Sequence, residues 1–156
     1  MARQVAKLMK EKNWALMDIE YIQTLKNHRC IRKLYILAKD GFREKELEFY
    51  PCIQYNQMKR RNKRAFNYCK ANIHKLSYYP QRYASPCSTA VEKLKNFIDD
   101  NNIDFILYKG GEIEVDLCAE LDIPAYNIEC FALEKAFSHD PRTEVNCYYN
   151  QLVYYL

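Results

Sequence analysis

Glycine is scarce in this chain, with 3 copies among 156 residues, which argues against a glycine-rich phosphate-binding loop and against repeats built on glycine turns. The sequence also has no internal repeat, no low-complexity segment and no apolar run approaching the ~20 residues of a membrane span. Its first ten residues carry charges where a signal peptide would be apolar. We therefore expect an intracellular protein, cytoplasmic or nuclear, with no membrane partner.

A disulfide framework is also disfavoured, because the seven cysteines are odd in number, widely spread and without a Cys-x-x-Cys pair. In an intracellular protein such cysteines are expected to be reduced thiols. Most of them would then act as small buried hydrophobic residues.

What the chain does contain is a globular composition, with 49% hydrophobic residues, 28% charged residues, a net charge of +4 and 14 tyrosines. This length and composition predict one domain over residues 1–156, with residues 1–13 as a basic N-terminal arm or helix. The small positive charge does not by itself establish a nucleic-acid partner.

The first third of the chain predicts three sequential antiparallel strands, at residues 14–24, 30–39 and 44–50. Asp40-Gly41 is typical of a tight hairpin between the second and the third. The segment that follows is harder to assign. Its basic run at 59–64 suits either a helix or a loop.

Residues 71–80 are expected to be irregular, and helices and strands then alternate. A helix is expected from Ser85-Pro86 to 99–102, with a capping-box pattern at Thr89 and Glu92. The elements after it are a buried strand at 103–108, a helix at 112–121, a strand at 125–130 and a last helix with Asp140 as N-cap. This order predicts a mixed α/β sheet, three antiparallel strands followed by two parallel strands with flanking helices, and it is similar to the ribonuclease H-like fold.

Asp18 and Glu20 stand two residues apart on the first predicted strand, so both side chains project from one face, about 7 Å apart at their Cα atoms. Carboxylates on a buried face need a partner or a cation to stay ionised, and two hard oxygen donors suit Mg²⁺ or Mn²⁺. The alternative is a solvated strand face with incidental acids.

Two further acidic elements follow in the second half. Glu112 and Asp116 are spaced i, i+4 after the buried strand, where α/β sheets place ligand sites, although acids in a first turn also stabilise the helix dipole. With Asp140 as N-cap, His139 and Glu144 occupy the N′ and N4 positions, which meet in space. Such a pair suits either a general base or a surface ion pair.

Together these motifs resemble the DEDDh family of 3′–5′ exonucleases, a divergent match within the ribonuclease H-like superfamily. That family carries D-x-E on its first strand, an acid on the helix after the fourth strand and H-x-x-x-x-D at the last helix. The matching residues here are Asp18 and Glu20, Glu112 or Asp116, and His139 with Glu144, where Glu replaces the family's Asp. Ile73-His74 also resembles the family's His-Gly-Ile segment.

The resemblance implies a two-metal mechanism with Mg²⁺ or Mn²⁺ and a nucleoside 5′-monophosphate product. His139 would take the proton from the attacking water. The implied metal ligands are Asp18, Glu20, Glu112 or Asp116, and Glu144.

A second resemblance is to the Maelstrom domain, a divergent relative in which many members carry a Glu-Cys-His-Cys zinc site. The segment Lys109-Gly-Gly-Glu112 and the spacing of His139 and Cys147 carry this resemblance. The cysteine expected three residues before the histidine is Ala136 here, with Cys130 as the substitute. Zinc held by His139, Cys147 and Cys130 is therefore the alternative metal site.

A basic run with aromatic residues near it is typical of a surface for single-stranded nucleic acid, with cations for phosphates and rings for base stacking. The alternative is a solvated charged loop with tyrosines packed beneath it. The residues expected to contact nucleic acid are Lys59, Arg60, Arg61, Lys63, Arg64, Tyr78, Tyr79 and Lys109.

Three functions therefore compete. The first is a metal-dependent 3′–5′ exonuclease acting on RNA or single-stranded DNA, with RNA favoured. The second is a catalytically inactive DEDDh-like or Maelstrom-like domain that binds RNA or a protein partner. The third is a structural α/β domain whose acids are incidental.

Overall fold

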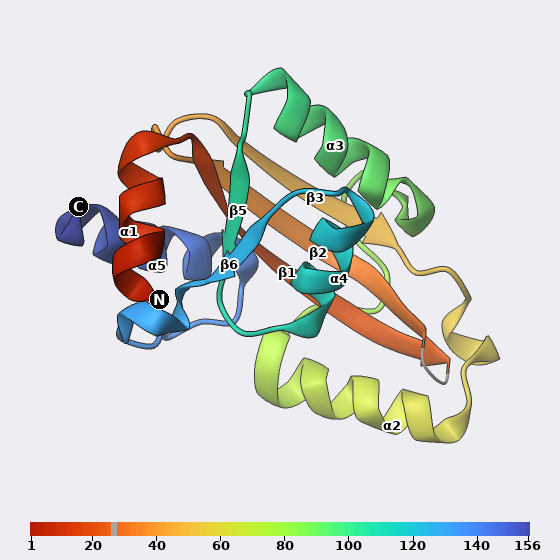
Figure 1. Ribbon diagram of the computed structural model, residues 1–156. Helices are drawn as coiled ribbons and strands as arrows, with labels where there is room; N and C mark the ends of the chain where they lie inside the picture. Colours follow the sequence, from red (N-terminus) through yellow and green to blue (C-terminus); the bar gives the residue numbers. More distant parts are fainter. Residues whose placement is uncertain (26–27) are drawn as a thin grey trace.

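A mixed six-stranded sheet forms the centre of the computed structural model, which describes residues 1–25 and 28–156. The strands are ordered β4-β3-β2-β1-β5-β6 (Figure 1). β1 (Trp14–Leu25), β2 (His28–Ala38) and β3 (Glu44–Tyr50) form an antiparallel meander. The three antiparallel strands expected in the first third of the chain are thereby confirmed.

Three short strands complete the sheet, each in parallel pairing. β5 (Phe105–Tyr108) lies beside β1, β6 (Ala125–Asn127) beside β5, and β4 (Ser85–Pro86) beside β3 at the opposite edge. The ladder between β5 and β1 covers Trp14 to Leu16, so the backbone of β1 beyond Leu16 needs other hydrogen-bond partners on that side. The mixed α/β sheet agrees with the sequence, and β4 adds a strand where a helix start was expected.

Helices cover both faces of the sheet (Figure 1). α3 (Ala90–Asp100) and α4 (Glu112–Glu120) pack against the odd-numbered residues of β1. α1 (Ala2–Glu11) and α5 (Pro141–Tyr155) pack against even-numbered residues on the other face. The alternation of side chains along β1 therefore divides the apolar interior into two cores, one on each side of the sheet.

The excursion between β3 and β4 carries α2 (Arg60–Cys69), which continues into a π-helical turn, η2 (Lys70–His74). The basic run, which suited helix or loop, is thus helical from Arg60, and Lys59 is its N-cap. α2 lies along the far end of β1, on the same face as α5 (Figure 1). A third, smaller core under it consists of Ile22, Met58, Phe66 and Tyr78.

Several element boundaries differ from the sequence expectations for local reasons. The Thr89 hydroxyl donates to the Pro86 carbonyl at 2.7 Å instead of capping α3, so the expected capping box does not form and the helix starts at Ala90. The last strand ends at Asn127, whose side chain accepts a hydrogen bond from the Glu129 amide and starts a 3-10 turn. The short 3-10 turns are η1 (Tyr55–Gln57), η3 (Cys87–Thr89) and η4 (Ile128–Phe131).

The turn predicted at Asp40-Gly41 is closer to expectation. Residues 39–43 link β2 to β3, and Asp40 Oδ1 accepts the amides of Phe42 and Arg43 at 2.9 and 3.0 Å. The loop is longer than the two-residue hairpin that Asp40-Gly41 predicts, but it lies where expected. No helix in the described part of the chain combines the length and the apolar character that crossing a membrane requires.

Candidate functional site

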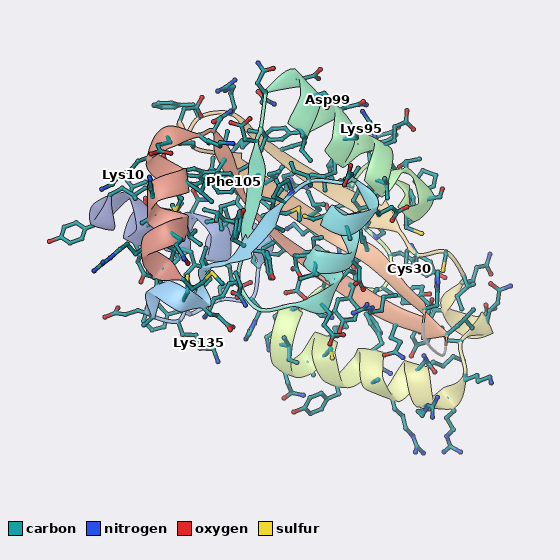
Figure 2. All side chains as sticks on the ribbon, viewed as in Figure 1. Lys10, Cys30, Lys95, Asp99, Phe105 and Lys135 are labelled. Carbon is teal, nitrogen blue, oxygen red and sulfur yellow. The ribbon has the colours of Figure 1, made fainter. Side chains whose placement is uncertain are left out.

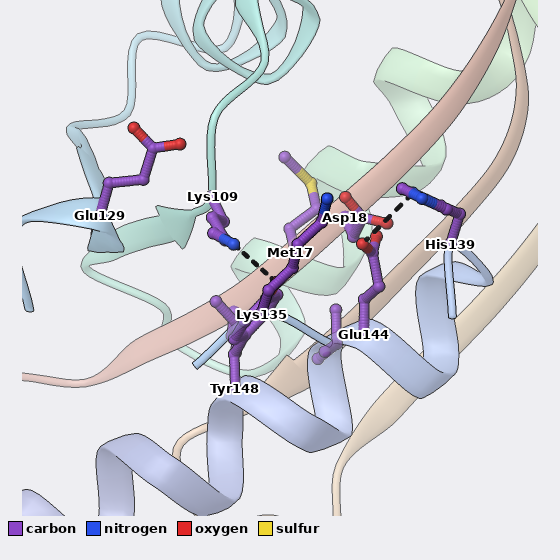
Figure 3. Close-up of a pocket in the computed structure, with 10 residues that line it drawn as sticks. Met17, Asp18, Lys109, Glu129, Lys135, His139, Glu144 and Tyr148 are labelled. Atoms are coloured by element: carbon purple, nitrogen blue, oxygen red, sulfur yellow. Dashed lines mark hydrogen bonds and ion pairs between the residues drawn. The ribbon is translucent and has the colours of Figure 1, made fainter. Parts of the chain in front are cut away.

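Three carboxylates from two elements converge at one point on the sheet. Asp18 and Glu20 project from the same face of β1. Glu144 reaches Asp18 from the first turn of α5 (Figure 3). One oxygen of each carboxylate lies within 4.8 Å of the others. The structure therefore brings together three of the acids that the sequence singles out.

The local sequence of β1 explains why acids face α5. Among its even-numbered residues, Leu16 belongs to the core under α1 and α5, and Ile22 belongs to the small core under α2. Asp18 and Glu20 occupy the two even positions between them and are partly buried. The acids therefore lie in the gap between two apolar cores, where they lose part of their hydration.

The start of α5 is held against the sheet by a polar network. Asp140 is the N-cap, and its Oδ2 accepts the Thr143 amide at 3.2 Å, as the Asp-Pro sequence predicts. Its Oδ1 accepts from Lys33 Nζ at 2.9 Å, and Lys33 also pairs with Glu46 at 3.2 Å. Burial alone would raise the pKa of Asp140, but the hydrogen bond and charge of Lys33 together with the hydrogen bonds from Thr143 outweigh it, and the pKa is lowered. This anchor positions the residues on either side of the N-cap.

His139 and Glu144 are the residues so positioned. His139 Nδ1 lies 3.8 Å from Glu144 Oε1, and their side chains are 42% and 16% exposed (Figure 3). The N′ and N4 positions thus meet as the sequence predicts. The arrangement places a solvent-accessible imidazole directly beside a cluster of carboxylates.

The acid cluster holds its protons tightly when no cation is present. Burial raises the pKa of Asp18 well above its usual range, and Glu144, close enough to share a proton with it, raises it further. Burial, followed by repulsion from Glu144 and Glu114, raises the pKa of Glu20 from 4.5 to about 8. Raised pKa values of this kind mark sites that a positive charge would stabilise.

Glu114 is a fourth acid of the site, and the sequence interpretation passed over it. It is 3% exposed, burial raises its pKa, and its Oε1 accepts the Ile19 amide at 3.2 Å. That amide lies on the part of β1 that β5 leaves unpaired. The other oxygen, Glu114 Oε2, is buried without a hydrogen-bond partner, as is Asp18 Oδ2.

A glycine makes room for Glu114. A Cβ on Gly111 would lie 2.0 Å from Glu114 Oε2, and Gly111 has a φ of +54°, a conformation that side chains disfavour. Gly110, with a φ of +70°, has its nearest such contact at 3.4 Å. The Gly110-Gly111 pair thus lets the chain turn from β5 into α4 with Glu114 aimed back at β1.

Glu112 and Asp116, in contrast, lie outside the cluster. Their side chains are 91% and 66% exposed, and both pair with Arg29, at 3.9 and 2.7 Å. The face of α4 that meets the sheet carries Ile113 and Leu117 instead. A sequence signal for Glu114 does exist, because it stands at i−3 from Leu117 and therefore on the apolar stripe, where an acid needs a reason.

A small cavity opens beside the acids and is flanked by lysines. Its volume is about 210 Å³, and Lys109 and Lys135 line it together with Asp18, Glu144 and His139 (Figure 3). Lys109 Nζ donates to the Tyr148 hydroxyl at 2.8 Å and lies 4.6 Å from the centre of that ring. Lys109, predicted from sequence to contact nucleic acid, is therefore held at the rim of the site.

The basic residues of α2 face solvent, with Lys59, Arg60, Arg61 and Arg64 exposed and Lys63 partly so. Tyr79 is 46% exposed, but Tyr78 is 5% exposed and its hydroxyl donates to the Ile53 carbonyl at 2.7 Å. Tyr78 is therefore a core residue and does not offer its ring to a base. The structure combines the two sequence alternatives here, a charged surface with one tyrosine packed beneath it.

The far end of α2 reaches the acid cluster. The charge of Glu20 raises the pKa of Cys69, after burial, and the charge of His139 helps lower the pKa of His74, after burial and Arg32. His74 Nδ1 accepts the Leu76 amide at 2.9 Å. The segment that resembles the His-Gly-Ile motif thus lies near enough to His139 for the two imidazoles to interact electrostatically.

A bulge in the sheet holds that segment in place. The register between β1 and β2 shifts after Glu20, at Arg32, whose side chain is 2% exposed. Arg32 donates to the Ser77 carbonyl and to Glu48 Oε1, both at 3.0 Å. Bulges near functional sites commonly re-aim one side chain in this way.

The zinc set inferred from the Maelstrom resemblance is not assembled. Within residues 1–25 and 28–156, two groups have three candidate ligand atoms close enough for one ion, and neither contains His139, Cys147 or Cys130. Cys147 Sγ instead accepts from the Gln151 amide at 3.5 Å. In comparisons with known proteins, neither a family model nor a curated protein matches the chain.

Proposed function

We propose that this protein is a divalent-metal-dependent nuclease of the DEDDh exonuclease type, on a ribonuclease H-like sheet, acting on single-stranded nucleic acid with RNA favoured. The observation that carries the proposal is the convergence of three carboxylates, Asp18, Glu20 and Glu144, beside a histidine. A fourth acid, Glu114, lies close enough for its charge to raise the pKa of Asp18 and of Glu20, and it accepts the Ile19 amide between them. Glu114 takes the place that the sequence resemblance assigned to Glu112 or Asp116.

The donor set fits Mg²⁺ or Mn²⁺. All four ligands are hard carboxylates, and two of their oxygens, Asp18 Oδ2 and Glu114 Oε2, are buried without a hydrogen-bond partner. Lys33, the cross-strand neighbour of Glu20, is already paired with Asp140 and Glu46. Cations held here would stabilise the charge that develops on the attacking and leaving oxygens of a phosphodiester.

The chain's own proton acceptor is His139. Its Nδ1 faces Glu144 Oε1 at 3.8 Å, which orients the ring and leaves Nε2 to take the proton of the attacking water. Its partial exposure lets the ring pass that proton on to solvent. Asp140 and Lys33 act as positioning residues, because they fix the helix start that carries both members of the pair.

Substrate affinity would come from cations around the acids. Lys109 and Lys135 at the cavity offer contacts to phosphates near the cleaved bond. The basic surface of α2 runs from about 8 to about 14 Å along the helix axis, counted from Cys69 back to Arg64 and to Arg60. A single strand entering over α2 would therefore meet positive charge before it reaches the acids, which otherwise repel phosphate.

The test is a time course on a 5′-labelled single-stranded RNA in Mg²⁺, Mn²⁺ or EDTA, with a circular RNA of the same sequence in parallel. We expect a ladder that shortens from the 3′ end, requires a divalent cation and spares the circle. Asp18→Asn should lower the rate about 100-fold or more, because it removes a charge from the centre of the cluster. Asp116→Asn is the matched control, because the Asp116 side chain on α4 is exposed, and this variant should cleave RNA at the wild-type rate.

Three outcomes would count against the proposal. Cleavage that persists in Asp18→Asn would point to a contaminating nuclease, and cleavage of the circle would exclude the exonuclease assignment. Folded protein that cleaves neither RNA nor single-stranded DNA in either metal would leave the inactive nucleic-acid-binding domain as the better reading. The same labelled RNA in a binding assay would then test that second function directly.

A further inference from the structure

A second cluster of possible metal ligands lies at the other end of the sheet, where β2 starts and β3 ends. His28 and Cys30 are the first and third residues of β2, and Cys52 follows β3. His28 Nε2 lies 3.2 Å from Cys52 Sγ and 3.5 Å from Cys30 Sγ. Figure 2 shows Cys30 at the end of the sheet remote from α1 and the C-terminus.

A fourth ligand is brought to the same place by the short strand β4. β3 and β4 pair in parallel, with Tyr50 opposite Pro86. Cys52 comes two residues after Tyr50 and Cys87 directly after Pro86, so both cysteines lie just beyond the same end of this ladder. Cys87 lines the same pocket as His28, Cys30 and Cys52, and its thiol lies close enough to those of Cys30 and Cys52 for them to influence its pKa. Sequence separation hides this set, because neither a Cys-x-x-Cys nor a His-x-x-x-His pair occurs in it.

The distances from His28 Nε2 to the sulfurs of Cys52 and Cys30 are close to those expected in a zinc site. With Zn–S near 2.3 Å and Zn–N near 2.0–2.1 Å in a tetrahedron, a sulfur and a nitrogen bound to one ion stand about 3.5 Å apart. The two observed nitrogen–sulfur distances are 3.5 and 3.2 Å. Little movement would therefore be needed to bind an ion between them.

The surroundings of the two sulfurs also suit thiolates. The Cys52 amide donates to Cys30 Sγ at 3.4 Å. The buried Thr24 hydroxyl lies 3.6 Å from Cys30 Sγ and 3.4 Å from Cys52 Sγ, so it can donate to either. Outer hydrogen bonds of this kind hold metal-bound ligands in place.

From this geometry we infer a structural zinc site formed by His28, Cys30 and Cys52, with Cys87 as the fourth ligand. Three thiolates and one imidazole select zinc over the hard cations that the carboxylate cluster favours. The site joins the two ends of the excursion that carries α2, because Cys52 begins that segment and Cys87 closes it. The zinc would thus secure the two-residue strand β4 and fix the base of the basic surface.

The inference is tested by the metal content of the purified full-length protein, prepared under reducing conditions without added metal. We expect about one zinc per chain by elemental mass spectrometry, released when a mercurial reagent blocks the thiols. Replacement by Co²⁺ should give the visible absorption of a tetrahedral thiolate site. This readout does not depend on nuclease activity, so its failure and the failure of the proposed function are distinguishable.

Cys52→Ser is the informative variant, because this side chain is exposed and its loss leaves the apolar cores intact. It should retain at least tenfold less zinc than the wild-type chain. Cys147→Ser, which removes a thiol outside the cluster, is the matched control and should retain all of it. Because a Cys52→Ser chain that misfolds would also lose zinc, circular dichroism must show the same secondary structure in both variants.

Three results would overturn the inference. One is a reduced, folded protein that contains no zinc and gives no Co²⁺ spectrum. Another is zinc that survives Cys52→Ser but is lost from Cys147→Ser, which would place the ion elsewhere. The third is a Cys30–Cys52 disulfide detected by mass spectrometry as the stable state of the pair.

Discussion

The carboxylate cluster and the thiol–imidazole cluster sit at two places on the same sheet and are built in opposite ways. The first combines Asp18 and Glu20 from β1 with Glu114 and Glu144 from two helices, and all its donors are hard oxygens. The second gathers thiols and an imidazole from strand ends and carries no carboxylate ligand. If both proposed metals bind, one small domain would separate them by donor chemistry alone, with a labile divalent cation at the carboxylates and a tightly held zinc at the thiols.

Burial differs between the two clusters in a way that matches those roles. Two oxygens of the acid cluster are buried without a hydrogen-bond partner and are therefore open to the proposed cation. The sulfurs of Cys30 and Cys52, in contrast, already have hydrogen-bond partners in His28 and Thr24. Variants that change one donor at a time therefore distinguish the two clusters.

The largest effect should come from Glu114. Glu114→Gln is expected to slow RNA cleavage about 10²–10³-fold, because it removes a charge from the cluster while keeping a hydrogen-bond acceptor for the Ile19 amide. Glu112→Gln, two residues earlier and exposed, should stay within about twofold of wild type. Equal losses in both variants, measured as initial rates at saturating Mg²⁺, would contradict the assignment.

Removal of zinc should lower the stability of the fold and leave the affinity of the acid cluster for divalent cations nearly unchanged. At free zinc about 100-fold above its dissociation constant, binding stabilises the fold by about 2.7 kcal/mol, so we expect Cys52→Ser to lower Tm by about 5–10 °C. Mn²⁺ binding to the acid cluster, followed by calorimetry, should change little. A variant with an unchanged Tm would show that the thiols bind no structural ion.

Gly111→Ala should disturb the acid cluster and leave the thiol–imidazole cluster unchanged. Its new Cβ would collide with Glu114 Oε2 and would sit on a backbone with positive φ, at a cost of about 1–3 kcal/mol. Gly110→Ala has the same backbone disadvantage without the collision, so the difference between the two variants isolates the contact. Urea unfolding gives the stabilities, and we expect cleavage to fall further in Gly111→Ala than in Gly110→Ala.

The free energy of unfolding should depend on pH when Mg²⁺ and Mn²⁺ are omitted. The pKa of Glu20 is about 8 in the folded chain against an ordinary 4.5, so between these values the folded state holds more protons than the unfolded state. Stability is therefore greatest at the acidic end of this window and falls as pH rises toward 8. Glu20→Gln should flatten the slope, and saturating Mg²⁺ should flatten it for the wild-type chain, because a bound cation displaces the proton from folded Glu20.

The smallest effect should come from the α2 surface. Replacing Arg60, Arg61 and Arg64 by Ala should weaken RNA binding and reduce the slope of log affinity against log salt by about 2, since each phosphate contact contributes about 0.7. The control replaces the same number of exposed cations on α1, namely Arg3, Lys7 and Lys10. If both triple variants change the slope equally, binding follows net charge and not a surface on α2.

Much of the fold could be predicted from local patterns. The antiparallel strands follow from β-branched and aromatic residues between turn signals, and the start of α5 follows from Asp140 and Pro141, whose capping geometry is local. Asp18 and Glu20 share a face because strand side chains alternate. Such features need only residues near one another in the chain.

The sequence predictions were wrong where contacts between residues distant in the chain determine the structure. β4 exists because Ser85 and Pro86 meet the edge of β3, and the sequence around them predicted a helix start instead. Tyr78 is aromatic and next to a basic segment, yet packing under α2 buries it. Neither outcome can be predicted from neighbouring residues in the sequence. The first depends on an open sheet edge at β3, and the second on the packing of α2 over the tyrosine.

By itself, then, the sequence determined the order of the main strands, the Asp18 and Glu20 pair and the meeting of His139 with Glu144, since periodicity and capping act over a few residues. The tertiary structure alone decided that Glu114, and not Glu112 or Asp116, turns toward β1. It also decided that Cys52 and Cys87 line one pocket, since the pairing of β3 with β4 brings together the two ends of the segment between them. The rotation of a helix on a sheet and the closure of a long loop are set by packing across the whole molecule.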